Sequence, residues 1–143
     1  MAVTVSLYNH TAAKFAEGSF KEGDTYKLML LDASGTFTGA NTVVGDVSAN
    51  EVSGNGWTAG GETLANVAVT TVTTNDAKFD ADDVSVTATG GAIGPAENAV
   101  IVDTTDTSAL VAHIAFGEAK TADVGTDFKV TWHADGIFAW TVT

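Results

Sequence analysis

The chain has 143 residues, and its 18 acidic and six basic residues give a formal charge of -12 at neutral pH. Proteins that bind nucleic acid or anionic membranes present basic surfaces that neutralise phosphates, so this charge argues against both functions. The absence of cysteine excludes disulfides and thiolate metal sites. With 45% apolar and only 17% charged residues, the sequence can form a packed core and is unlike a disordered acidic tail.

Alternation of apolar and polar residues, rich in Val and Thr, dominates the chain from its start. Such alternation predicts β-strands, because β-branched side chains fit a pleated, half-buried surface. It recurs in eight segments, at 3–8, 26–30, 67–74, 84–87, 99–102, 110–116, 128–132 and 138–142. Two further segments are predicted to be short helices: Thr11–Glu17, which Gly18 closes, and 41–50, which Gly45 interrupts.

The predicted fold is all-β: one domain over residues 1–143, forming an antiparallel β-sandwich or a jelly-roll-like barrel of about eight strands. The two helices are too short to provide the crossovers of a parallel sheet. Ala134-Asp135-Gly136 predicts a hairpin between the last two strands. Within 110–116, the alternation predicts Leu110 on the same face as Ile114, with Val111 opposite.

No catalytic or cofactor motif emerges from the sequence, so we expect a protein that is not an enzyme. His10, His113 and His133 show neither a triad nor a metal-ligand spacing. Residues 54–59 match the letters of a dinucleotide-binding motif, but Gly60-Gly61 follows where a helix must begin. We therefore expect a glycine-rich loop and no bound cofactor.

Asp80, Asp82 and Asp83 place three carboxylates within four residues, which makes them a weak candidate for a calcium site. The spacing departs from a calcium-binding loop of the EF-hand type, which needs Gly at its sixth position and Glu at its twelfth. Ser85 and Gly91 hold those positions here. The expectation is therefore a solvated acidic turn without a metal.

Candidate interface residues come from strand edges and from one loop. The N-terminal segment, with Val3, Val5 and Tyr8, is a candidate interaction arm, since an edge strand offers unpaired backbone groups to a partner. Trp57 lies in the glycine-rich loop. It is either an exposed hot spot for binding or a plug that folds back into the core.

Several stretches of the sequence resemble a family of small virion proteins of tailed bacteriophages. The similar stretches are 51–67 (EVSGNGWTAGGETLANV), 78–84 (KFDADDV), 110–117 (LVAHIAFG) and 128–137 (FKVTWHADGI), with 7–9 and 26–30 near the start. Together they span most of residues 51–137. These motifs are structural and contain no site chemistry.

The resemblance implies a capsid decoration, or cement, protein that binds the major capsid protein on the outer surface of the shell and stabilises it. It also implies synthesis in the bacterial cytoplasm, and we find no signal peptide or membrane-spanning segment in the sequence. Self-association as a symmetric dimer or trimer is expected. The alternative is a tail, spike or fibre-associated virion protein that binds a receptor or glycan.

Overall fold

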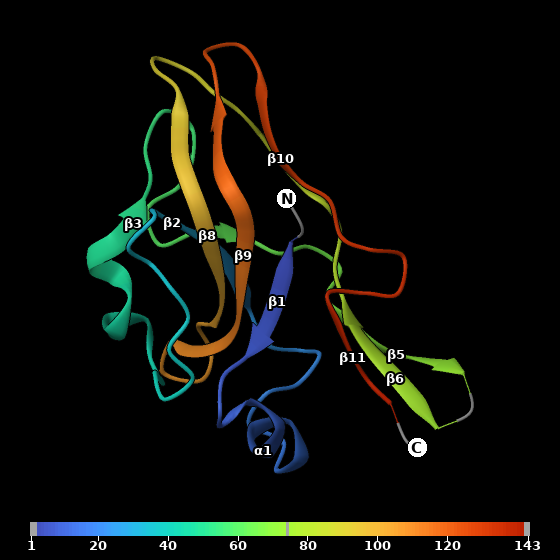
Figure 1. The fold of residues 1–143 in the computed structure, drawn as a ribbon. Coiled ribbons are helices and arrows are strands. Elements are labelled where there is room, and N and C mark those ends of the chain that lie inside the picture. Colours follow the sequence, from blue (N-terminus) through green and yellow to red (C-terminus); the bar gives the residue numbers. More distant parts are fainter. Residues whose placement is uncertain (1–2, 74, 142–143) are drawn as a thin grey trace.

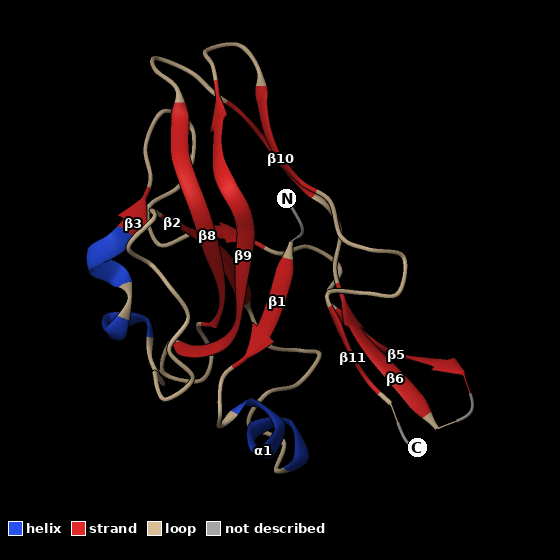
Figure 2. Ribbon diagram, in the orientation of Figure 1, coloured by secondary structure: helices blue, strands red, loops and turns tan. Residues whose placement is uncertain are grey.

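The computed structural model describes residues 3–73 and 75–141, which fold mainly into antiparallel strands (Figures 1 and 2). This confirms the predicted all-β fold. The described residues form eleven strands: β1 (Thr4–Leu7), β2 (Tyr26–Leu31), β3 (Glu51–Val52), β4 (Glu62–Thr63), β5 (Ala68–Thr73), β6 (Asp76–Asp80), β7 (Val84–Thr87), β8 (Ile93–Asp103), β9 (Ala109–Ala122), β10 (Asp127–Val130) and β11 (Phe138–Trp140). They also form one α-helix, α1 (Thr11–Ala16), and two 3-10 helices, Val44–Asp46 and Ser48–Asn50.

The strands form one large sheet and two small ones. The large sheet has the order β1-β9-β8-β2-β3, and β4 pairs with the other end of β2. β8 and β9 are its longest strands and form an antiparallel hairpin at its centre (Figure 1). One small sheet pairs β10 with β7, and the other has the order β11-β6-β5.

The main core lies between one face of the large sheet and the two small sheets, as in a β-sandwich. Leu28, Ile101 and Ile114 enter it from the large sheet, while Phe79 and Phe128 enter from the small sheets. α1 lies at one end of this layer (Figure 1), where Phe15 contacts Phe79 at 5.7 Å between ring centroids.

The opposite face of the large sheet is also covered. Met29, Leu31, Val100 and Leu110 form a second buried cluster with Tyr8. Val44 begins the first 3-10 helix and packs against this cluster, and Val47, between the two helices, belongs to it. The segment predicted as a weak helix therefore forms two 3-10 turns, and its role is to shield this second face.

One predicted face in β9 is wrong, because a β-bulge interrupts the alternation. Ile101 pairs with Ala112, but the next residue, Val102, pairs with Leu110, so Val111 is an extra residue. Val111 therefore joins Ile114 in the main core, while Leu110 turns to the second cluster.

The predicted hairpin at 134–136 is also wrong. The turn exists, with the Gly136 N–H donating to the His133 carbonyl at 2.9 Å. The strands on either side of it, however, belong to different sheets, since β10 pairs with β7 and β11 pairs with β6. A glycine turn predicts a change of direction, but it does not determine which strands pair.

All eight predicted strand segments contain strands, and β3, β4 and β6 are additional. β6 covers Asp76–Asp80, where an acidic turn was expected from Asp80 onward. Residues 74 and 142, the predicted ends of two strands, and the first two residues of the predicted N-terminal arm lie outside the described residues.

Trp57 is a core plug, with 1% of its surface exposed. A tight turn holds it, in which the N–H and C=O groups of Gly54 and Trp57 bond to each other at 2.8 and 3.1 Å. Its ring packs edge-on against Phe128 of β10, with 5.5 Å between centroids. Trp57 thus links the glycine-rich loop to one of the small sheets.

We predict that Trp57→Ala lowers the free energy of unfolding by about 3 to 5 kcal/mol, because it leaves a large cavity between the sheets. Chemical denaturation monitored by circular dichroism would measure the change. Val124→Ala, at a side chain that is 62% exposed, is the control and should change stability by less than about 0.5 kcal/mol. A loss below 1 kcal/mol for Trp57→Ala would contradict this account of the core.

Candidate functional site

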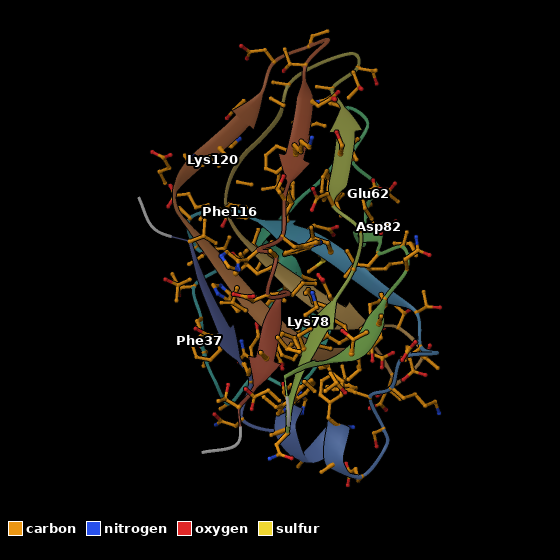
Figure 3. The ribbon with its side chains drawn as sticks, turned by 90° about the vertical axis from the view of Figure 1, so that its right-hand side faces the viewer. Phe37, Glu62, Lys78, Asp82, Phe116 and Lys120 are labelled. Atoms are coloured by element: carbon orange, nitrogen blue, oxygen red, sulfur yellow. The ribbon has the colours of Figure 1, made fainter. Side chains whose placement is uncertain are left out.

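A cleft of about 720 Å³ lies between the β1–β9 edge of the large sheet and β10. It arises because β10 leaves β9 and pairs with β7 instead. The turn between β9 and β10 is fastened to the end of β7, where the Ala88 N–H donates to Thr126 O and the Gly125 N–H donates to Ala88 O, both at 2.8 Å. Figure 3 looks onto this side of the molecule, with Phe116 and Lys120 of β9 labelled.

The floor of the cleft is apolar. Ile114 and Phe116 come from β9, Phe128 and Val130 from β10, and Ile137 follows the 133–136 turn. All five are buried members of the main core. Alternation in β10 sends Phe128 and Val130 inward and leaves Asp127 and Lys129 exposed at the rim.

The rim carries charges that largely compensate one another. Lys120 forms an ion pair with Glu118, which lowers the pKa of that carboxyl. Asp127 accepts hydrogen bonds from Thr87 Oγ1 at 2.6 Å and Ser85 Oγ at 3.2 Å, and these bonds lower its pKa. Rim carboxylates in this arrangement already have partners within the chain.

Lys129 is a cation at the rim, and its charge adds to the lowering of the pKa of Asp127. Within residues 3–73 and 75–141, no ion pair joins Lys129 to a carboxylate. Its side chain is exposed and lines the cleft. The local balance of charge at the cleft therefore differs from that of the whole chain, which carries a net charge of -12.

The turn at 133–136 closes one end of the cleft and is held in place. Lys78 of β6 donates to Ala134 O at 2.8 Å and forms an ion pair with Asp80 at 3.1 Å. Gly136 has a φ of +93°, and a Cβ there would lie 2.9 Å from Phe79 O. The wall is therefore fixed by a close backbone approach that only glycine allows.

The predicted interface residues separate into two pairs. Val3 and Val5 line the cleft, and Val3 is 60% exposed. Tyr8 is buried in the second cluster, where burial first and Asp46 second raise the pKa of its hydroxyl. Since Tyr8 and Trp57 are only 2% and 1% exposed, neither offers a contact surface in this fold.

The three histidines are not brought together. His10 Nε2 donates to Leu110 O and His113 Nε2 donates to Gly35 O, both at 2.7 Å. Burial lowers the pKa of His113, which favours its neutral form. His133 lies at the cleft rim, where its Nδ1 is 3.4 Å from a carboxylate oxygen of Asp135.

The three carboxylates of the calcium candidate have separate partners. Asp80 pairs with Lys78, Asp82 accepts a bond from Asn66 Nδ2 at 2.6 Å, and Asp83 accepts one from the Trp132 N–H at 2.9 Å. Among the described residues, no group of three or more His, Asp or Glu side chains is arranged to hold a metal ion. These carboxylates brace loops and β6.

The most perturbed carboxyl lies away from the cleft, at the end of β8. Burial raises the pKa of Asp103 to about 6, and the neighbouring carboxyl of Asp24 adds to the rise. Asp103 Oδ1 accepts bonds from the N–H groups of Thr105 and Asp106, at 2.8 and 3.1 Å. Asp103 Oδ2 is buried without a hydrogen-bond partner in the described part of the chain. The Asp103 carboxyl thus caps the turn at Thr105 and Asp106, and burial of its charged form disfavours ionisation.

We predict that Asp103 makes stability depend on pH. Because its folded pKa is above its unfolded value, its contribution to the free energy of unfolding is complete below about pH 4. That contribution is lost as the pH rises through about 6. Asp103→Asn keeps the Oδ1 acceptor and removes the charge, so its stability relative to wild type should rise between pH 4 and 7. Parallel denaturation curves with a difference that does not change with pH would contradict the prediction.

In comparisons with known proteins, no family model, no curated protein and no solved structure matches the chain. Within the described ranges, the helices are all too short and too polar to cross a membrane. The functional interpretation therefore depends on the chemistry of the cleft and on the motifs in the sequence.

Proposed function

We propose that the chain is a structural protein of a tailed-bacteriophage virion, most specifically a capsid decoration protein that binds the major capsid protein and stabilises the shell. The observation that carries this proposal is the apolar cleft bordered by strand edges. Its floor is hydrocarbon, and its rim groups do not converge on one point as the groups of a catalytic site do. Such a surface suits a protein partner better than a reacting small molecule.

The stretches that resemble phage virion proteins support the proposal through their positions in the fold. Trp57, Phe79, Ile114 and Phe128 belong to the similar stretches and are buried in the main core. The resemblance therefore concerns the residues that determine the fold. Most of the 128–137 stretch also lines the cleft, so the same stretch would serve both packing and binding.

The charge of the chain supports a structural partner with a basic surface. A net charge of -12 attracts a positively charged protein over distances of about 10 Å at moderate salt. It also keeps the chain away from packaged DNA. Attachment to the outside of a shell agrees with both effects.

We predict that the purified chain binds saturably to phage shells that lack it, with a fixed number of copies per capsomer. Binding should favour expanded shells and raise their melting temperature, because a ligand that binds only the assembled state stabilises it. Cryo-electron microscopy would count the copies and calorimetry would measure the melting temperature.

Absence of binding to both unexpanded and expanded shells would contradict the decoration function. If the chain were found on purified tails instead, the tail, spike or fibre function would replace it. A glycan-binding screen would then be the next experiment.

A further inference from the structure

We infer that the cleft receives an extended segment of a partner protein, which adds as a strand to the free edge of β10 and lays alternate apolar side chains on the cleft floor. The inference rests on the proposed function, since it names the surface through which a shell subunit would be held. It specifies how that subunit would bind: through backbone hydrogen bonds to β10 and through complementary charge.

β10 has a free edge that faces the cleft. Among the described strands it pairs only with β7, in the register Phe128↔Val86 and Lys129↔Ser85. The bond from the Ala88 N–H to Thr126 O fixes the alternation of this ladder. The N–H and C=O of Lys129 therefore point away from β7, where an added strand can bond to them.

The facing edge of β9 is less suited to strand addition. Pairing of β9 with β1 ends at Ala115. Beyond it β9 still pairs with β8 on one side, but no described strand pairs with the edge that borders the cleft. Here the register with β8 shifts, and Gly117 has a φ of +81°. The register shift and the left-handed Gly117 interrupt regular backbone pairing along this edge. We therefore assign the backbone pairing to β10 and the apolar contact to the floor.

Burial of this rim carries a small electrostatic penalty. Glu118 and Asp127 already have partners in the chain, so an incoming uncharged segment leaves no lone carboxylate without water. Lys129 would remain exposed at the edge, and a carboxylate or hydroxyl on the segment would complement it. The preferred segment thus alternates apolar residues with acidic or neutral polar ones.

The occupant is a different protein and not a second copy of this chain. Two copies would each bring a net charge of -12, so repulsion opposes their pairing at this cleft, and the dimer or trimer expected from the sequence would need a different contact surface. A partner whose surface is basic outside the inserted segment gains from the same field. The net charge thus favours a basic partner protein, while the free edge of β10 and the apolar cleft floor determine which segment of that partner can bind.

The test compares the binding of two variants of Lys129 to expanded shells. Lys129→Pro removes the outward N–H but leaves the bonds to β7, because proline is tolerated on an edge strand whose N–H faces outward. Lys129→Thr removes the same charge and keeps the N–H. We expect Lys129→Pro to weaken binding about tenfold and Lys129→Thr to weaken it no more than about threefold.

A second pair of variants tests the cleft without altering the backbone. Val3→Glu places a charge at the cleft mouth, on a residue exposed enough to leave folding intact. Val72→Glu places the same charge on β5, at a side chain that is 44% exposed and outside the cleft. We expect a loss of binding for Val3→Glu only, with equal thermal unfolding of the two free variants.

The outcomes separate this inference from the proposed function. Equal shell binding by all four variants and the wild type would overturn the inference and leave the decoration function standing. If the wild type binds no shell, the decoration function fails, and the cleft is then tested with a surface-displayed library of 12-residue peptides. Enrichment of alternating apolar sequences on the wild type, lost with Lys129→Pro, would support the inference, whereas no enrichment would overturn it. A wild-type dimer in sedimentation that Lys129→Pro dissociates would overturn the choice of occupant.

Discussion

Aromatic packing between the sheets is the interaction on which the rest of the structure depends. Leu, Ile, Phe and Trp together number only 20, so few large side chains are available to hold the layers together. Phe79 holds the β11-β6-β5 sheet, because it stacks on Phe138 at 4.9 Å and meets Tyr26 of the large sheet at 5.1 Å. Trp57 holds β10 through Phe128. Each small sheet is thus attached through aromatic rings, since its own strands are too short to be stable alone.

The cleft follows from this arrangement. Packing of Phe128 against Trp57 and the bonds at Ala88 draw β10 towards β7 and away from β9. The sandwich is consequently not closed on this side, and its core residues form the floor of the opening. The same contacts that stabilise the small sheet therefore leave the edge of β10 free. The packing of Phe128 against Trp57 therefore contributes both to the stability of the fold and to the proposed binding surface.

The sequence predicted the strands well because their alternation of side chains is a local property. It could not predict the partners of those strands, as the turn at Gly136 shows, because pairing depends on contacts between residues far apart in the chain. The bulge at Val111 likewise could not be predicted, because no pattern in the neighbouring residues marks it. Val5 lies in the edge strand β1 and Val3 directly precedes it, and both stay candidate interface residues, whereas the sequence did not point to the rim residues Asp127 and Lys129. Their role arises only from the separation of β10 and β9.

Amide hydrogen exchange at Lys129, measured with and without expanded shells, reports directly on strand addition at β10. We expect this amide to exchange quickly in the free chain, since it points away from β7. It should become strongly protected when the chain is bound, while the amides of β5 keep their rates. A shell-bound chain in which the Lys129 amide still exchanges at its free rate would contradict strand addition at β10.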